Sequence, residues 1–238
     1  MSSKCEVAFV LAAGRGERLR PLTNHTPKPL LPVKGKPILD YALRQLMPLG
    51  LRRVVLNAWH LGSQVIDYVN TRKDVFGFEL IVSEEPELLG TGGGLRQAYP
   101  LLFKDIQKGP VLMVNGDCLW SGDVGGFVKS GLSDSAAGRW WLAPEESDQT
   151  PVGLKSGHIV QIGKLWSKPS FAVDRKGCFT GIQLFKELEY DLLPQKGCII
   201  RDYWIPQLER GSVLSGDFEN LDSWMDLGTP ARYEKVRD

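Results

Sequence analysis

Short apolar runs alternate with expected helices through the N-terminal half of the chain. The apolar runs predict four buried strands, at residues 7–11, 53–57, 78–82 and 111–114. Helices are expected at residues 38–46, 63–69 and 94–102, and apolar side chains recur at helical spacing in the first of them. This βαβα order predicts an α/β fold of the Rossmann-like kind, with a mostly parallel central sheet and helices on both faces.

The pattern is less regular beyond Ser121, where Gly, Ser and Asp concentrate up to residue 138. Short strands are predicted at 139–142, 158–163 and 179–184, with a helix near 201–210. Thr229 followed by Pro230 predicts the N-cap and first residue of a final helix. No repeat or low-complexity linker occurs, so we predict a single domain over residues 1–238, with halves of about 1–120 and 121–238.

Charge and composition exclude several classes of partner. The chain has 238 residues and a net charge of +1, so no global field draws it to nucleic acid or to an anionic membrane. Its four cysteines show no C-x-x-C spacing, which favours free thiols in a reducing compartment. We expect a cytoplasmic protein, because neither a signal peptide nor an apolar run long enough to span a bilayer is found. The oligomeric state stays open.

Small residues follow the first predicted strand, and cations follow them. The stretch after Leu11 is Ala12, Ala13, Gly14, Arg15 and Gly16, so backbone N–H groups there are accessible to an anion. Further positive charge comes from Arg18, Arg20 and Lys28, the last held between two prolines. A bare backbone beside four cations suits a polyphosphate.

Three other interpretations of this loop compete with a polyphosphate site. A dinucleotide-binding fingerprint requires a third glycine where Leu19 stands, and Pro21 prevents a long helix from starting there. A P-loop requires Gly-Lys-Ser/Thr, which is absent. A simple turn would account for Gly14 and Gly16 but not for the four cations.

Residues 11–23 read L-A-A-G-x-G-x-R-x-x-P-L-T, and residues 27–30 read P-K-P-L. This pair of motifs resembles the signature of the sugar-phosphate nucleotidyltransferases, the NDP-sugar pyrophosphorylases, and the resemblance extends over nearly the whole chain. It implies a nucleotidyltransferase fold and Mg²⁺-dependent transfer of a nucleotidyl group from a nucleoside triphosphate to a sugar 1-phosphate. Within the family, the chain is most similar to members that use UTP and N-acetylmuramate 1-phosphate in peptidoglycan recycling.

The resemblance also implies the roles of individual residues, and it assigns the first half of the domain to the nucleotide and the second to the sugar phosphate. The catalytic residues would be Arg18, Lys28, Asp117 and Asp226, with Mg²⁺ held by Asp117 and Asp226. The nucleotide would contact Leu11, Ala12, Ala13, Gly14, Gly16, Gly92 and Asn115, and the sugar phosphate Lys168, Thr180 and Gly181. By residue type alone, Asp117 also fits a turn or helix cap, and Lys168 fits a solvated surface position.

Two alternative functions stay open at this stage. The same loop motifs would serve a mannose 1-phosphate guanylyltransferase or a glucose 1-phosphate nucleotidyltransferase. A nucleotide-sugar-binding module or a glycosyltransferase is an alternative of another class. A glycosyltransferase would be expected to bind its metal through Asp-x-Asp, which Asp117-Cys118-Leu119 does not match.

Overall fold

The computed structural model describes residues 4–145, 149–168 and 171–238. Ten strands form the main sheet: β1 (Val7–Leu11), β4 (Arg53–Ala58), β5 (Glu79–Glu84), β6 (Val111–Asn115), β8 (Gly138–Ala143), β9 (Pro151–Lys155), β10 (His158–Ile162), β11 (Trp166–Ser167), β12 (Arg175–Phe185) and β13 (Leu214–Asp217). Two small sheets pair β2 (Pro32–Val33) with β3 (Lys36–Pro37), and β7 (Cys118–Gly122) with β14 (Leu221–Asp226). The helices are α1 (Ile38–Leu46), α2 (Gly62–Asn70), α3 (Gly90–Leu102), α4 (Val124–Ser133), α5 (Ile205–Glu209) and α6 (Pro230–Glu234).

The main sheet is mixed, which corrects the prediction that it is mostly parallel. Strands β5, β4, β1 and β6 lie side by side and are parallel, as the βαβα rhythm predicts. The following strand, β12, is antiparallel to β6, to β8 and to β9. In this half a hairpin replaces the helical crossover: β9 and β10 are joined by Ser156 and Gly157, both with positive φ. The prediction therefore holds for the four N-terminal strands, whereas in the C-terminal half β13 is parallel to β8 and the pairs made by β12 are antiparallel.

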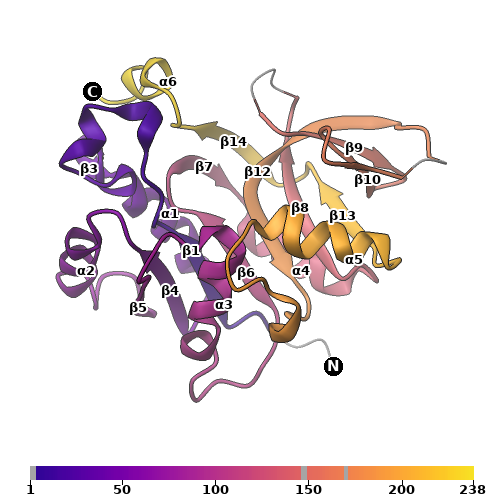
Figure 1. The fold of residues 1–238 in the computed structure, drawn as a ribbon, viewed down its shortest axis with the longest axis horizontal. Helices are drawn as coiled ribbons and strands as arrows, with labels where there is room; N and C mark the ends of the chain where they lie inside the picture. The colour runs from indigo at the N-terminus through magenta and orange to yellow at the C-terminus, as the bar shows by residue number, and fades with distance from the viewer. Residues whose placement is uncertain (1–3, 146–148, 169–170) are drawn as a thin grey trace.

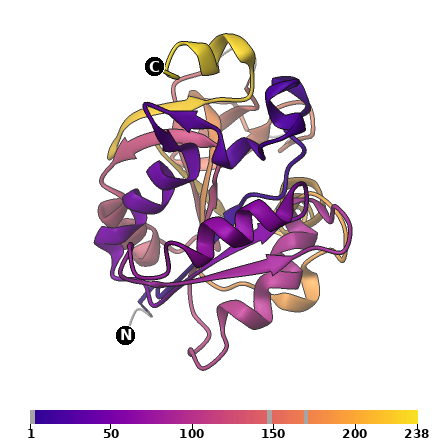
Figure 2. The same ribbon diagram turned by 90° about the vertical axis from the view of Figure 1, so that its left-hand side faces the viewer.

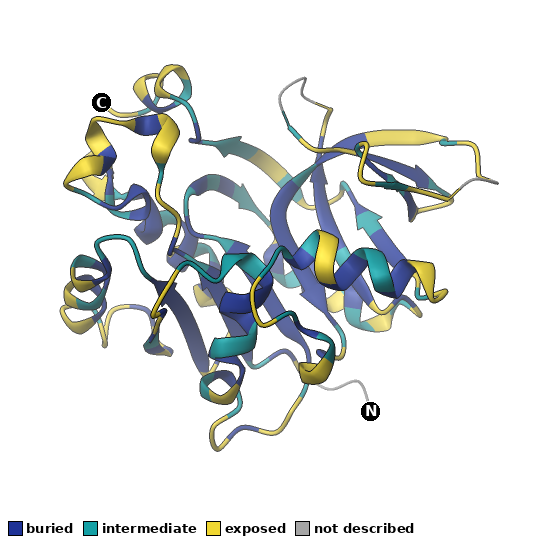
Figure 3. Ribbon diagram, viewed as in Figure 1, coloured by how far each residue is buried: buried dark blue, intermediate teal, exposed yellow. Residues whose placement is uncertain are grey.

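Alternate residues of the strands supply two separate cores, one on each face of the sheet. In β1, Val7 and Phe9 face the core covered by α3 and α5, whereas Ala8 and Val10 face the core covered by α1, α2 and α4. Figure 1 shows α3 and α5 in front of the sheet, and Figure 3 shows its central strands β1, β4 and β6 buried. The predicted helices on both faces are therefore present.

The C-terminal segment returns to the N-terminal half and packs there. Leu227 and Tyr233 join a third apolar cluster with Leu19 and Leu31. The Tyr233 hydroxyl donates to the Pro32 carbonyl at 2.7 Å. Figures 1 and 2 both show β14 and α6 beside the early part of the chain. As a result, residues near position 226 lie close to the loop that follows β1.

Several element boundaries differ from the predictions. The helix predicted from residue 94 begins at Gly90, and the region near 201–210 forms a π-helical turn (Ile200–Trp204) followed by α5. Strands β7, β9, β13 and β14 and helix α4 were not predicted, because they are short or rich in glycine and serine. The four cysteines are present as thiols, as expected. Across the described residues, no helix is both long and apolar enough to cross a membrane.

The predicted cap of the final helix is confirmed. The Thr229 side chain accepts a hydrogen bond from the Arg232 N–H at 3.4 Å, and Pro230 is the first residue of α6. We expect Thr229→Ala to lower the free energy of unfolding by about 1 kcal/mol, because an orphan N–H group loses its acceptor. Urea denaturation measures this change, and Thr229→Ser is the control. Equal stability of the Ala and Ser variants would show that the cap contributes nothing.

Candidate active site

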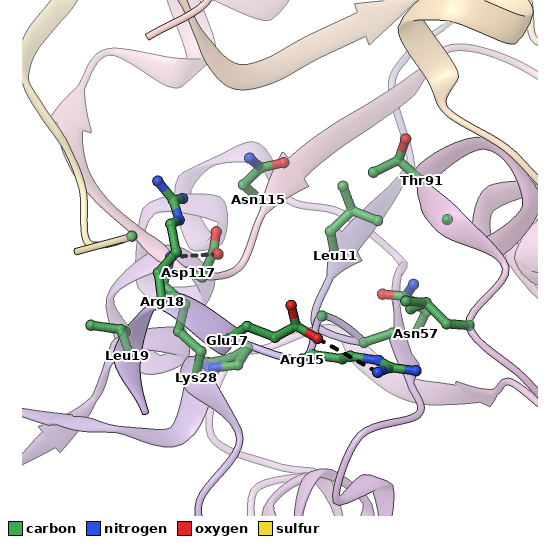
Figure 4. Close-up of a pocket in the computed structure, with 17 residues that line it drawn as sticks. Leu11, Arg15, Glu17, Arg18, Leu19, Lys28, Asn57, Thr91, Asn115 and Asp117 are labelled. Atoms are coloured by element: carbon green, nitrogen blue, oxygen red, sulfur yellow. Dashed lines mark hydrogen bonds and ion pairs between the residues drawn. The ribbon is translucent and has the colours of Figure 1, made fainter. Parts of the chain in front are cut away.

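A cavity of about 620 Å³ opens at the carboxyl ends of the parallel strands β1, β4 and β6 (Figure 4). Each strand places its last or next-to-last residues on the cavity wall, and ligands of α/β sheets bind at this edge. Eight residues predicted from the sequence line it: Leu11, Ala13, Gly14, Gly16, Arg18, Lys28, Asn115 and Asp117. Ala12 is buried directly behind the wall.

The loop after β1 is folded back and fixed in place. Gly16 has a φ of +62°, and a Cβ there would lie 2.7 Å from the Thr23 side chain, so only glycine fits. The Thr23 hydroxyl donates to the Gly16 carbonyl at 2.9 Å. Gly14 is different, because a Cβ added there would contact nothing within 4 Å. Gly14 therefore presents exposed backbone toward the cavity.

Lys28 is buried between two carboxylates. Its Nζ lies 2.7 Å from Asp117 Oδ2 and 3.4 Å from Asp226 Oδ1. Pro27 and Pro29 flank it, and Lys28 opens a 3-10 turn (Lys28–Leu30). Burial alone would lower the pKa of Lys28, but the neighbouring carboxylates outweigh burial and raise it. Lys28 is therefore a fixed positive charge in the cavity wall.

Asp226 lies beside Asp117 because β14 pairs antiparallel with β7, although Asp226 itself is not among the residues that line the cavity. Asp226 stands opposite Cys118 in that register, which places it beside Asp117. Its Oδ2 lies 3.4 Å from the Arg232 guanidinium and 3.8 Å from that of Arg18. The two carboxylates, separated by 109 positions in sequence (226 − 117), thus converge on one cluster of cations.

The donor set at this cluster fits a divalent cation of the Mg²⁺ type. Asp117 and Asp226 already hold one cation, the Lys28 ammonium, between them. Among the described residues, no group of three or more His, Cys, Asp or Glu side chains forms a metal cage. Two carboxylates supplemented by phosphate oxygens are a usual Mg²⁺ environment, so a metal here would depend on bound substrate.

The residues predicted to contact the sugar phosphate are not part of the cavity lining. The buried Thr180 hydroxyl donates to the Trp141 carbonyl at 2.6 Å. Gly181 has a φ of +83° and packs against Asn115, which does line the cavity. Lys168 follows β11, and its Nζ lies 4.9 Å from the ring centroid of Phe171. The structure therefore brings Gly181 next to the cavity and leaves Lys168 outside its lining.

The glycine-rich stretch at residues 90–94 forms the first turns of α3. A Cβ on Gly92 would lie 2.6 Å from Pro194 Cγ, so Gly92 packs against the loop at residues 194–199 and is not among the cavity-lining residues. Its neighbours Leu88, Gly90 and Thr91 form that wall instead. The Thr91 hydroxyl accepts a hydrogen bond from the Ile199 N–H at 2.8 Å.

Two further lining residues, Arg15 and Asn57, were given no specific role from the sequence, although Arg15 was counted among the cations of the loop. Arg15 lies with its guanidinium 5.0 Å from the Trp59 ring centroid and 3.5 Å from the Glu17 carboxylate. Asn57 lies at the end of β4 and is 2% exposed, yet one side of it contributes to the cavity wall. Figure 4 shows Asn57 and Thr91 on one side of the cavity and Arg18 and Asp117 on the other. The position of Asn57 at the carboxyl end of a predicted strand was the signal available.

Residues 7–238 match the nucleotidyl transferase family, and the chain therefore belongs to that family. The match includes the loop after β1, both carboxylates and the final helix. Its relatives identify it more closely as an enzyme of the sugar-1-phosphate nucleotidyltransferase class.

Two curated relatives illustrate the range of this class. The N-acetylmuramate alpha-1-phosphate uridylyltransferase of Neisseria meningitidis serogroup B is 31% identical over 237 residues, covering 97% of this chain and 96% of the relative. The mannose-1-phosphate guanylyltransferase catalytic subunit beta of Drosophila melanogaster is 30% identical over 224 residues, covering 94% of this chain but 59% of the relative.

Solved structures share the fold. A structure described as a putative glucose-1-phosphate thymidylyltransferase from Bacillus anthracis superposes with a TM-score of 0.80 at 20% identity, covering 97% of this chain and 93% of the other. HddC from Yersinia pseudotuberculosis, complexed with GMP-PN, gives a TM-score of 0.74 at 22% identity and covers 97% of each chain.

Proposed function

We propose that this enzyme transfers the uridylyl group of UTP to N-acetylmuramate 1-phosphate and releases pyrophosphate. The observation that carries the reaction type is the convergence of Lys28, Asp117 and Asp226 beside the open loop at Gly14. The choice of substrates rests on the Neisseria relative, which aligns over almost the full length of both chains. The product would serve peptidoglycan recycling.

In this mechanism, an oxygen of the sugar 1-phosphate attacks the α-phosphorus of the nucleoside triphosphate, and pyrophosphate leaves. The attacking group is already an anion, so the protein has no proton to remove. Its task is to hold two mutually repelling phosphates in line and to stabilise the charge that develops. The backbone at Gly14 and the Arg18 guanidinium would bind the leaving pyrophosphate, and the Lys28 ammonium would lie near the α-phosphate.

Asp117 and Asp226 would hold Mg²⁺ when substrate is bound. The ion would supply charge neutralisation at the phosphates. Arg232 contacts Asp226 and so helps to fix the orientation of that carboxylate. Asn115 would contact the nucleotide, and Gly181, which packs against it at the end of β6, would face the sugar phosphate.

A mannose 1-phosphate guanylyltransferase is the second candidate. The identity to the Drosophila relative is nearly as high, at 30%, but the alignment leaves about two fifths of that relative unmatched (100% − 59%). The uridylyltransferase, in contrast, matches this chain end to end. We therefore place the guanylyltransferase second.

A substrate panel tests the proposal. Purified protein with Mg²⁺ is offered UTP, GTP, CTP or dTTP, each with N-acetylmuramate 1-phosphate, mannose 1-phosphate or glucose 1-phosphate, and pyrophosphate release is measured. We expect UTP with N-acetylmuramate 1-phosphate to give the highest kcat/KM, by about tenfold or more, because a site that hydrogen-bonds one base strongly rejects the others.

The outcomes separate the two parts of the proposal. Preference for GTP with mannose 1-phosphate would reject the uridylyltransferase and keep the reaction type. If no pair releases pyrophosphate while a nucleoside triphosphate still binds, the protein is a binding module and the reaction type is rejected as well.

A further inference from the structure

A buried carboxylate connects two walls of the nucleotide cavity. Glu85 follows the last residue of β5 and is 4% exposed, although it lies in the charged sequence Glu84-Glu85-Pro86-Glu87. The nearby glutamates Glu84 and Glu87 are both exposed. A buried charged group needs hydrogen bonds to offset the loss of water. The hydrogen-bond partners of Glu85 therefore show how its burial is tolerated.

Both carboxylate oxygens of Glu85 accept hydrogen bonds from cavity elements. Oε1 accepts from Asn57 Nδ2 at 2.6 Å, and Oε2 accepts from the Leu89 N–H at 2.9 Å. On its other side, Asn57 Oδ1 accepts from the Ala12 N–H at 2.7 Å. An unbroken series of three hydrogen bonds thus runs from the phosphate-side loop after β1 to the wall formed by residues 88–91. We call Asn57 and Glu85 the cross-cavity bridge.

The first turns of α3 pack closely against Asn57 and Glu85. A Cβ on Gly94 would lie 2.5 Å from Glu85 Oε1 and 2.8 Å from Asn57 Nδ2, so glycine is required for α3 to approach. Leu89, which donates to Glu85, immediately precedes α3. Burial raises the pKa of the Glu85 carboxyl, and the hydrogen bonds from Leu89 and Asn57 reduce that rise without cancelling it.

Under the proposed function, the loop after β1 would bind the triphosphate, and the wall formed by residues 88–91, here called the base-side wall, would face the base. Ala12 begins the loop whose open backbone at Gly14 faces the cavity, and Leu89 adjoins the wall at Gly90 and Thr91. All three hydrogen bonds of the bridge lie within the first half of the domain. Under the proposed function, in which the first half binds the nucleotide, the bridge would affect the nucleotide and not the sugar phosphate.

We infer that Glu85 is a positioning residue that sets the spacing between the phosphate-binding loop and the base-side wall, and so the affinity for the nucleoside triphosphate. This inference rests on the proposed function, in which the cavity binds that nucleotide. Glu85 acts through Asn57 and Leu89 and contacts no substrate. Because the spacing is the same before and during the reaction, it affects binding of the ground state and the transition state equally.

Replacing Glu85 by glutamine removes one acceptor without changing the size of the side chain. Whichever way the amide is turned, its NH₂ group faces either Asn57 Nδ2 or the Leu89 N–H, and two donors oppose each other. We expect the KM for UTP to rise about tenfold, with kcat within about threefold and the KM for the sugar 1-phosphate within about twofold. Gly94→Ala adds a methyl group that displaces the same carboxylate. We expect it to raise the KM for UTP as well.

Matched controls separate this effect from a general loss of stability. Glu79→Gln makes the identical change at the opposite end of β5, where Glu79 pairs with Arg53 at 2.7 Å. Gly62→Ala adds a methyl group to a helical glycine whose Cβ would meet only Ala58, at 3.6 Å. Neither position lines the nucleotide cavity. Both controls should keep the wild-type KM for UTP, whatever their melting temperatures.

The double variant Asn57→Asp with Glu85→Gln tests the bridge by reconstruction. The carboxylate introduced by Asn57→Asp would accept from the Ala12 N–H and from the glutamine NH₂. The glutamine oxygen would accept from the Leu89 N–H, so every donor again has an acceptor. We expect this variant to bind UTP more tightly than Glu85→Gln alone. Calorimetric titration with UTP measures the same affinities without turnover.

Three results would overturn the inference. The first is an unchanged KM for UTP in Glu85→Gln. The second is an equal rise in the KM values of both substrates, and the third is a double variant that binds UTP no better than Glu85→Gln. A wild-type protein that binds UTP but releases no pyrophosphate with any partner would instead reject the proposed function, and the UTP titrations would still decide the role of Glu85.

Discussion

Asp117→Asn and Asp226→Asn are each expected to reduce nucleotidyl transfer by about 10²–10³ and to raise the Mg²⁺ concentration needed for the remaining activity. Both carboxylates contact Lys28, so they face the same small volume beside the phosphate loop. Neither carboxylate alone makes an adequate Mg²⁺ site. Because the two act as a unit, the double variant should be little worse than either single variant. Rates measured over a range of Mg²⁺ concentrations test this expectation.

Asp222→Asn provides the matched control for this pair. Asp222 lies on the same strand, β14, but is exposed, so its replacement should leave the rate and the Mg²⁺ requirement unchanged. Full activity in Asp226→Asn would refute a shared metal site. Rates that fall in both single variants and then multiply in the double variant would show that the two carboxylates act independently.

The structure changes what these substitutions are expected to do to stability. Two carboxylates at one site would repel each other, and the sequence alone suggests that removing both leaves stability unchanged or slightly higher. In the structure, Lys28 lies between them and neutralises that repulsion. Each single substitution leaves Lys28 with one carboxylate partner. We therefore expect the free energy of unfolding to fall by about 1–2 kcal/mol, which is less than the loss expected when a buried charge keeps no partner. Denaturant unfolding measures it.

Lys28→Ala should reduce turnover by about 10²–10³, which corresponds to roughly 2–4 kcal/mol of lost transition-state stabilisation. The side chain is 7% exposed and is held by two carboxylates, so its ammonium occupies one position in the cavity wall. Water entering the truncated site cannot replace a fixed charge. Steady-state pyrophosphate release measures the effect.

Two further variants make the Lys28 result specific. Lys36→Ala removes an exposed lysine a few residues away, in β3, and should retain wild-type turnover. Lys28→Arg should restore only part of the activity, because a planar guanidinium does not fit a site shaped around a compact ammonium. Normal turnover in Lys28→Ala would end the assignment of this cavity to phosphate binding.

The sequence predicted the parts of the site that depend on local structure. The apolar run at β1, the small residues after it and the Pro-flanked Lys28 each have a short-range signature, and all of them meet at the cavity. The parallel arrangement of β1, β4 and β6 followed from the βαβα rhythm and located the strand ends correctly. A short sequence motif was therefore sufficient to predict the parts of the site that are formed by residues close together in the sequence.

Contacts between distant segments could not be predicted in the same way. Gly92 looked like exposed backbone, yet Pro194, more than a hundred positions away, covers it. Glu85 lies in an acidic run typical of a solvated surface, and only Asn57 and Leu89 together make its burial tolerable. In the C-terminal half, β8, β10 and β12 were predicted as strands, but β9 and β13, which are four or five residues long and carry glycine, were not. Such short strands form only against neighbours that are already in place.

The return of β14 to the N-terminal loop has a consequence for synthesis on the ribosome. The loop, Lys28 and Asp117 are all translated in the first half of the chain, but the second carboxylate is not available until Asp226 has emerged and β14 has paired with β7. A nascent chain that has completed β1, β4, β5 and β6 therefore contains the loop after β1 and Asp117 but not the second carboxylate. Under the proposed function, we therefore expect turnover to begin only after β14 has paired with β7.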